Sequence, residues 1–560
     1  MRFHQRVVLS AGLRVAVTAV TAVFTATAVF AVTAATAVFA VFAATAATAA
    51  AATVTPPTAA ATATKPVKLL PVPKERTVVT HHHVVIDGRS IAYTATAGTL
   101  LLYNAKHQPT ASVFYIAYTR DGAHGAANRP VTFAYNGGPG FASALVDIGG
   151  FGPRRIVWPA PGDLQAQQPP YRLVANDDSI LASSDLVFID AIGTGYSRLA
   201  GAGTPKMFYG IKGDASAFAQ FIQRYITRFD RWNSPKFLLG ESYGTTRSAV
   251  LAQDLVAKGV YVNGVILCST VLDLPTINFS AGNDLPYALY LPSYAAVAWY
   301  HHRLQPQPAS LQAAVSAAEQ FAGTDYQQAL FAGSALAPAA RARVAARLAQ
   351  LTGIPAALWL RADLRMTLPV FMRRLLGDAG AMTGRYDARY TAPELQPLLP
   401  VPGHSDAGAT TTAIWGALAA SFDRYLRDDL HYTSTHLYKQ DSGKVFKAWS
   451  WSYRSPLNSV GSGVGNLQAR DVAPALARAM NNDPGMQLML NNGYFDMATP
   501  FFATDYTIRH MGLPAAALAS RVHEFDYPVG HMLYLNPQVL PVLSRHIDAF
   551  IAGAAPAGHG

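Results

Sequence analysis

The chain has 560 residues, of which 51% are hydrophobic and 14% charged, with a formal net charge of +11 at pH 7. This length fits about two to four domains, or one large α/β enzyme with an insertion. The two densest groups of arginines, at 341–347 and 373–374, lie in helical-looking sequence, where a solvated face is expected. No nucleic-acid-binding module is recognisable, which argues against a nucleic-acid partner. Cys268 is the only cysteine, so the chain cannot form an intramolecular disulfide. It lies in the apolar segment "VNGVILCST", which predicts a buried core residue rather than a reactive thiol.

Residues 1–64 are predicted to form a leader. They contain no acidic residue, and after Arg2, Arg6 and Arg14 they consist mainly of Ala, Thr and Val. A basic start, an apolar run and small residues before a cleavage site are typical of an export signal. The run is longer than an ordinary signal sequence, so an uncleaved membrane anchor is the alternative.

Residues 65–279 are predicted to form the first part of an α/β core. Segment 78–120 alternates in hydrophobicity and carries Asp-Gly turns, which indicates β-hairpins. Short apolar strands follow at 131–135, 185–190, 236–240 and 262–269, with an apolar helical stripe at 214–229 and a helix from Ser242 to a stop at Gly259. Strands that alternate with helices predict a mostly parallel sheet with helices on both faces.

The alternation breaks after about residue 275. Residues 280–435 have helical periodicity and are predicted to form a largely helical insertion, a lid or cap. Sheet-like sequence returns at 486–496 and 521–532, so residues 436–560 are predicted to form the second part of the core.

"GESYG", residues 240–244, has the G-x-S-x-G form between an apolar strand and a helix. In this setting the flanking glycines permit a sharp turn that exposes the Ser242 hydroxyl as a nucleophile. The backbone N–H of Tyr243, at the start of the helix, then points to where negative charge develops on a substrate. The alternative is an ordinary loop serine.

A serine nucleophile needs a base, and in this type of fold an acid and then a histidine follow the serine in the chain. Asp496 and His531 each follow a predicted strand, at the carboxyl edge of the sheet. His531 would accept the proton of Ser242, and Asp496 would orient the imidazole. Other candidates for the acid and the base do not lie in loops that follow a strand. His523 lies within a strand, and Asp505 and His510 lie on a helix that begins near residue 502.

A second glycine-rich turn, "NGGPG" at 136–140, also follows a strand. Its glycines allow the backbone to approach a ligand closely, and the N–H of Gly138 is the candidate for a second oxyanion donor. A tight turn without a ligand is the alternative. In contrast, "GSGVG" at 461–465 follows no clear strand and is predicted to be a loop.

Together "NGGPG", "VFIDAIGTGYS", "GESYG", "NNGYFD" and "GHM" resemble the serine carboxypeptidases, α/β-hydrolases that remove C-terminal amino acids. The resemblance covers roughly residues 120–550. Proline iminopeptidases are similar at "GGPG", but they typically carry His before these glycines and no acid before the serine. The resemblance implies that Asn136, the Gly137 N–H and Glu241 bind the terminal carboxylate of the substrate. Glu241 can do so only when protonated, because two adjacent carboxylates cannot both stay ionised.

The sequence departs from the better-known eukaryotic members of that family. Phe141, Ala142 and Ser143 follow "NGGPG" where those members carry a cysteine and serines, and their disulfides are absent. A second glutamate usually precedes the next Gly-Pro, but Gly150 stands near that place in "IGGFGPRR". These differences are more like a bacterial branch, and they argue against assuming a strongly acidic optimum.

The sequence therefore predicts an exported α/β-hydrolase with a helical cap that acts as a serine carboxypeptidase on peptides with a free C-terminal carboxylate. Neither a metal nor a cofactor is expected. An esterase or acyltransferase on the same scaffold is one alternative, because the catalytic residues alone do not determine the acceptor. A non-catalytic binding protein with this fold is the other.

Overall fold

The computed structural model describes residues 69–122, 129–158, 168–394, 408–454 and 470–555. The predicted leader at 1–64 and the predicted loop at 461–465 lie outside these ranges. Within the described ranges, no helix combines the length and the apolar character needed to cross a membrane.

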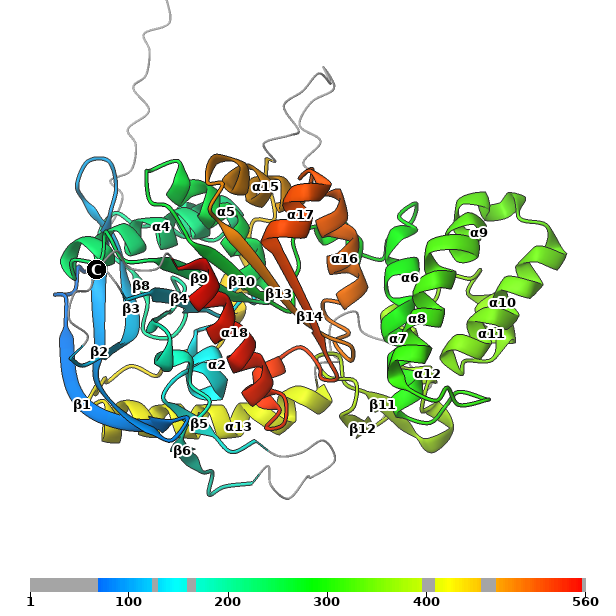
Figure 1. Cartoon of the computed structure of the whole chain (residues 1–560), viewed down its shortest axis with the longest axis horizontal. Helices are drawn as coiled ribbons and strands as arrows, with labels where there is room; N and C mark the ends of the chain where they lie inside the picture. Colours follow the sequence, from blue (N-terminus) through cyan, green and yellow to red (C-terminus); the bar gives the residue numbers. More distant parts are fainter. Residues whose placement is uncertain (1–68, 123–128, 159–167, 395–407, 455–469, 556–560) are drawn as a thin grey trace, which may run out of the picture. The chain divides into compact units, whose positions relative to one another are not determined.

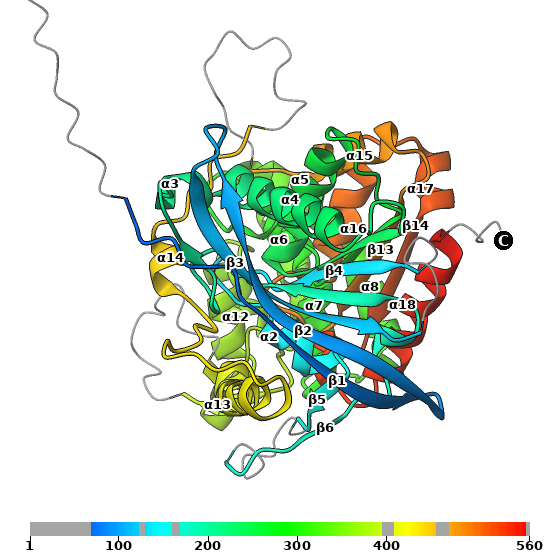
Figure 2. The same ribbon diagram turned by 90° about the vertical axis from the view of Figure 1, so that its left-hand side faces the viewer.

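A ten-stranded mixed sheet forms the centre of the fold (Figure 1). The first strands pair antiparallel and curve across one side of the molecule (Figure 2). Asp87 and Gly88, one of the predicted Asp-Gly turns, join the first two of them. From β7 to β14 neighbouring strands are parallel, which confirms the predicted fold class. In sheet order the strands are β1 (Thr77–Ile86), β2 (Arg89–Tyr103), β3 (Pro109–Arg120), β7 (Asp185–Ile189), β4 (Val131–Tyr135), β9 (Lys236–Glu241), β10 (Gly264–Cys268), β13 (Gln487–Gly493) and β14 (Val522–Tyr527), with β8 (Arg198–Leu199) paired to β3.

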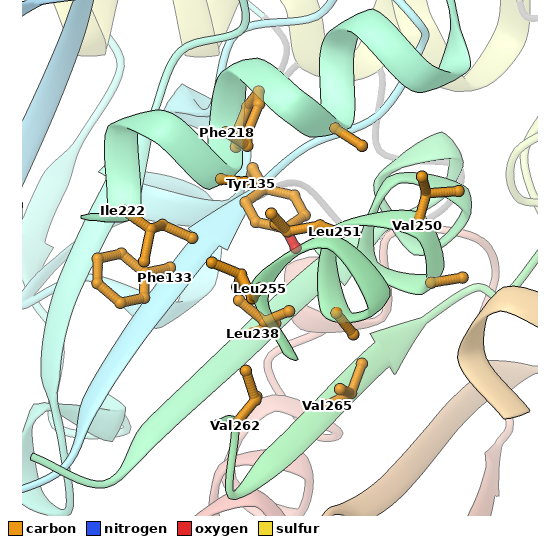
Figure 3. Close-up of a cluster of buried hydrophobic side chains, with 14 of the residues drawn as sticks. Phe133, Tyr135, Phe218, Ile222, Leu238, Val250, Leu251, Leu255, Val262 and Val265 are labelled. Atoms are coloured by element: carbon orange, nitrogen blue, oxygen red, sulfur yellow. The ribbon is translucent and has the colours of Figure 1, made fainter. Parts of the chain in front are cut away.

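Helices cover both faces of the sheet because successive strand residues point to opposite sides. Leu238 packs into a cluster with helices of one face, whereas Leu239 belongs to the cluster on the other face. Figure 3 shows the first cluster, in which Leu238 lies beside Leu255. The first face carries α4 (Ile211–Arg228), α5 (Tyr243–Val256) and α15 (Ala473–Asn482), and the second carries α2 (Ala144–Val146), α13 (Gly408–Arg424) and α18 (Leu540–Ala554).

The helix after Ser242 ends earlier than predicted. It stops at Val256, and the predicted stop, Gly259, lies in the following turn with a φ of +74°. There the N–H groups of Lys258 and Gly259 donate to carbonyls three residues earlier, so the last turn tightens before the glycine is reached. Cys268 is buried in β10, as predicted.

The helices between residues 285 and 374 surround an apolar cluster of their own, which also takes in Phe495, Met497 and Phe501 from the second part of the core. Figure 1 shows these helices beside α16 (Phe501–His510). Helix α13 packs instead against the sheet, although it falls within the predicted insertion. The boundaries at 280 and 435 stay predictions. The helices are α6 (Leu285–Leu289), α7 (Leu291–Tyr300), α8 (Leu311–Phe321), α9 (Gln327–Ala332), α10 (Pro338–Thr352), α11 (Ala356–Arg361) and α12 (Leu368–Arg374).

Smaller elements connect these layers. They are β5 (Arg154–Ile156), β6 (Leu173–Ala175), α3 (Pro205–Phe208), β11 (Ala381–Thr383), β12 (Thr391–Pro393), α14 (Gly443–Lys447) and α17 (Ala515–Arg521).

Candidate active site

Ser242 lies on a sharp turn between β9 and α5. Its φ of +60° and ψ of −129° are rare for a residue with a side chain. A Cβ atom at Gly240 would lie 2.4 Å from the carbonyl oxygen of Gly244, so the turn requires glycine there. The Ser242 N–H donates to the carbonyl of Cys268 at 3.0 Å, which ties the turn to β10. This is the strand–turn–helix geometry that the sequence predicts.

The glycine turn at 136–140 packs against the start of α5. A Cβ atom at Gly137 would lie only 2.4 Å from the backbone nitrogen of Tyr243. Within the described part of the chain, the N–H groups of Gly138 and Tyr243 donate no hydrogen bond. Two such donors at adjoining turns are available to an incoming oxygen atom, and their assignment as an oxyanion hole stays a prediction.

His531 and Asp496 are joined by a 2.7 Å hydrogen bond between the imidazole Nδ1 and the carboxylate Oδ2. Both side chains are buried, each following a parallel strand. Burial on its own would lower the pKa of His531, but the adjacent charge of Asp496 and its hydrogen bond raise that pKa above the ordinary value. The pair thus stabilises an imidazolium, which is what a general base needs after it accepts a proton.

Thr499, which the sequence analysis missed, helps to hold Asp496. Its hydroxyl donates to Oδ2 at 2.6 Å, and the backbone N–H groups of Ala498 and Thr499 donate to Oδ1 at 2.7 and 3.0 Å. A side-chain oxygen that accepts N–H groups two and three residues later is a common local motif, so "DMAT" carried a signal that could have been recognised.

The second imidazole nitrogen of His531 faces the turn that carries Ser242. Nε2 lies 3.6 Å from Oε1 of Glu241, and Ser242 lines the same cavity as His531. Among the described residues the Ser242 hydroxyl has no hydrogen-bond partner, so its side chain is free to rotate toward Nε2. In proteins without substrate, such bonds are often unmade and form in the substrate complex. The ring of Tyr386 covers the imidazole at a centroid distance of 5.1 Å.

Glu241 and Asn136 are in direct contact, whereas their binding of a substrate carboxylate stays a prediction. Asn136 Nδ2 donates to Glu241 Oε2 at 2.9 Å, and both residues are buried. Burial raises the pKa of Glu241, against the opposing effects of His531, Asn136 and the Gly137 backbone N–H. The raised pKa favours the protonated carboxyl, the form in which Glu241 can donate to a carboxylate.

A cavity adjoins these groups. One helical face of α13, with spacing i, i+3, i+4 and i+7, forms a wall of it. Its lining is mostly apolar apart from the residues already described: Phe141, Ala142, Ala144, Leu145, Tyr386, Thr411, Ile414, Trp415, Leu418, Gln440 and Met532. The rivals His510 and His523 are exposed and do not line this cavity.

A model of the serine carboxypeptidase family matches residues 94–280, which include both glycine-rich turns but neither Asp496 nor His531. Among solved structures, the chain is similar to a prohormone-processing carboxypeptidase from Saccharomyces cerevisiae, with 15% identity and a TM-score of 0.50 over 82% of this chain and 91% of that chain. It is also similar to a proline iminopeptidase from Mycobacterium smegmatis, with 13% identity and a TM-score of 0.33 over 82% and 99% of the two chains. No curated protein matches.

The structural likeness at this identity concerns the fold, an α/β-hydrolase with a mostly parallel sheet. The family match covers the turn that carries Ser242 and the turn that carries Asn136. The predicted resemblance is confirmed, whereas the bacterial branch stays a prediction. Residues 94–280 therefore match the serine carboxypeptidase family, a family of hydrolases.

Proposed function

We propose that this protein removes the C-terminal amino acid from peptides through an acyl-enzyme, with Ser242 as nucleophile, His531 as general base and Asp496 as its orienting acid. The observation that carries the proposal is the 2.7 Å bond between His531 Nδ1 and Asp496 Oδ2. It leaves Nε2 facing the turn of Ser242, where a base would have to lie.

In the first half-reaction, Ser242 Oγ attacks the carbonyl carbon of the last peptide bond while its proton moves to His531 Nε2. The carbonyl oxygen becomes an oxyanion, for which the free N–H groups of Gly138 and Tyr243 are suited. The tetrahedral intermediate collapses, the C–N bond breaks, and the imidazolium gives its proton to the departing amine. The products are an ester on Ser242 and a free amino acid.

In the second half-reaction, water takes the place of the departed amino acid. His531 Nε2 accepts a proton from the water as its oxygen attacks the ester carbon. Collapse of the second tetrahedral intermediate breaks the bond to Ser242 Oγ, which takes the proton back from the imidazolium. The shortened peptide leaves with a new carboxylate, and the enzyme regains its starting state.

Recognition of the terminal carboxylate is assigned to Glu241, with Asn136 and the Gly137 N–H beside it. The burial that raises the pKa of Glu241 supports this role, because a protonated carboxyl donates a hydrogen bond where an ionised one repels. Substrate affinity should therefore fall as the pH rises through the pKa of Glu241. Unchanged pH dependence of kcat/KM in Glu241→Gln would contradict this role.

The cavity also indicates which C-terminal side chain is preferred. The groups assigned to the carboxylate line the same cavity as Phe141, Trp415 and Leu418, so the side chain of the last residue has to lie among apolar groups. No lysine or arginine lines the cavity within the described residues. We expect kcat/KM to be higher for blocked dipeptides ending in Phe or Leu than for those ending in Lys or Glu, since a charge there loses its hydration.

Labelling with a fluorophosphonate tests the nucleophile. The wild-type protein should be labelled at Ser242, and Ser242→Ala should not be. The control is Ser269→Ala, because Ser269 is a buried serine whose hydroxyl donates to the His531 carbonyl at 2.5 Å rather than facing the cavity. Absence of labelling in the wild-type protein would favour the non-catalytic alternative.

A matched pair of substrates tests the reaction. We expect a blocked dipeptide with a free C-terminal acid to be hydrolysed much faster than its C-terminal amide. Equal turnover of both, together with faster turnover of simple esters, would favour the esterase or acyltransferase. Export by residues 1–64 is likewise proposed, from the composition of the leader. Recovery of the full-length protein in the cytoplasmic fraction alone would contradict it.

A further inference from the structure

Both polar atoms of the Asn136 side chain already have hydrogen-bond partners within the protein. Its Oδ1 accepts the backbone N–H of Val146 at 3.0 Å. Its Nδ2 donates to Glu241 Oε2 at 2.9 Å and to the Tyr534 hydroxyl at 3.3 Å. Because an amide nitrogen carries only two hydrogens, Tyr534 determines where the second one points.

Tyr534 reaches Asn136 because Gly150 leaves room for its ring. Tyr534 lies three residues after His531 and is fully buried. A Cβ atom at Gly150 would lie 2.5 Å from the Cβ of Tyr534, so no side chain fits between them. The ring packs beside Phe151 at a centroid distance of 5.0 Å. The tyrosine thus occupies space that any larger residue at position 150 would need.

We propose that Tyr534 is a positioning residue for recognition of the substrate carboxylate: its hydroxyl fixes the Asn136 amide so that one N–H stays on Glu241. This inference rests on the proposed function of the same site. With Asn136 held at three points, the Glu241 carboxyl keeps one orientation before substrate arrives, which reduces the ordering cost of binding.

The phenol also differs from an acid in how it responds to pH. Burial, together with the neighbouring Glu241 carboxyl, raises the pKa of Tyr534 well above its ordinary value, so the hydroxyl stays neutral throughout the working range. The position beside Asn136 therefore adds no second titrating acid. The titratable groups that face Glu241 are His531, Asp496, Tyr386, Cys268 and Tyr534.

The test compares two substrates in Tyr534→Phe, which keeps the ring and removes only the hydroxyl. For a blocked dipeptide with a free acid, we expect kcat/KM to fall by about five- to tenfold, mostly through KM, as for the loss of one hydrogen bond. For p-nitrophenyl acetate, which has no terminal carboxylate, we expect less than a twofold change. A purely structural role of Tyr534 would lower both.

A pH profile gives a second readout. The bond from Asn136 lowers the pKa of Glu241, so loosening Asn136 should raise it. The rise in KM for the free-acid peptide at alkaline pH should then begin at a higher pH in Tyr534→Phe. The matched control is Tyr326→Phe, which removes another buried phenol hydroxyl. That hydroxyl donates to the Leu364 carbonyl at 2.6 Å, within the apolar cluster formed by the helices between residues 285 and 374. It should leave both readouts unchanged.

A double-mutant cycle keeps the inference falsifiable if Tyr534→Phe is less stable. In an Asn136→Ala background, Tyr534→Phe should have no further effect on the ratio of the two substrates. If the wild-type enzyme prefers the free acid over the amide and Tyr534→Phe keeps the wild-type substrate ratio, the inference is wrong and the proposed function stands. If the wild-type enzyme shows no such preference, both fail.

Discussion

Arg247 donates a 2.7 Å hydrogen bond from Nη1 to the backbone carbonyl of Asn136. Arg247 lies on α5, the helix that begins after Ser242, whereas the carbonyl opens the glycine turn, so one guanidinium joins the two turns of the site. Its Nε donates to Asp214 at 2.7 Å, and its guanidinium lies 4.3 Å from the centroid of the Phe218 ring. Both charged side chains are buried, so each depends on the other.

Arg247→Met should therefore destabilise the protein and impair the site. Breaking a buried ion pair on one side costs about 3–5 kcal/mol, because Asp214 is left without its counter-charge. We expect the free energy of unfolding, measured in urea, to fall by that order. In the double variant Arg247→Met/Asp214→Asn part of this loss should be regained, since no uncompensated charge remains. Equal stability of the single and the double variant would contradict this account.

Asp496→Asn should abolish most activity without unfolding the protein. An amide at this position cannot stabilise the imidazolium of His531, and comparable changes lower kcat by about 10⁴. Peptide hydrolysis measures the effect, and retained thermal unfolding shows that the fold persists. A decrease in kcat of less than tenfold would mean that Asp496 does not orient the base.

Thr499→Val tests the support of Asp496. The substitution keeps the shape but removes a hydroxyl that donates to the carboxylate at 2.6 Å. A hydrogen bond to a charged group is worth about 1.5–3 kcal/mol, so we expect kcat/KM to fall by about tenfold or more. The control is Thr507→Val, which removes a buried hydroxyl bonded to the Ala503 carbonyl on α16. Equal effects of the two variants would show only general destabilisation.

The sharp turn at Ser242 was predictable because its signal is local. Strand, glycines and helix lie within a few residues of Ser242, and Asp496 and His531 each follow a recognisable strand. Parallel strands bring such positions to one edge of the sheet, so chain order alone was informative. Their catalytic roles stay predictions.

The supporting residues were not predictable in this way. Tyr534 meets Asn136 across 398 residues of sequence, and Arg247 meets the Asn136 carbonyl across 111. No periodicity encodes such pairs, because they depend on how distant elements pack. The same holds for the cavity wall. The sequence predicts α13 to be part of the cap, so it does not reveal that one face of this helix lines the cavity; that follows from the packing of α13 against the sheet.

Arg385→Leu should shift the acid limb of the pH–rate profile. Burial lowers the pKa of His531, whereas the carboxylates of Asp496 and Glu241 raise it. The cation of Arg385 also lowers this pKa, because it repels the imidazolium. Removing Arg385 should therefore raise the pKa of His531. Because the base must be neutral to accept a proton, the acid limb of kcat should move to higher pH. The exposed Arg374→Leu is the control, and an identical limb in both variants would contradict the prediction.

Asp505→Asn should stabilise the protein at alkaline pH. Asp505 lies on α16, and burial together with Asp526 and Glu524 raises its pKa to about 7, although Arg509 opposes the shift. The Asp505 carboxyl thus binds its proton more tightly in the folded state than in the unfolded state. The free energy of unfolding therefore falls as the pH rises from about 4 to 7, and the contribution of Asp505 is constant above that. The ion pair with Arg509 offsets little of this loss of stability, because the Arg509 side chain is 64% exposed to solvent.

Asparagine cannot ionise, so it removes this loss. We expect the variant to have a higher Tm than the wild-type protein at pH 8, and a much smaller advantage at pH 4, where the wild-type carboxyl is protonated when folded. Thermal unfolding at both values measures the difference. The exposed Asp325→Asn serves as control and should show no such pH dependence. A gain in Tm that is equal at both pH values would mean that packing, rather than the charge of Asp505, is responsible.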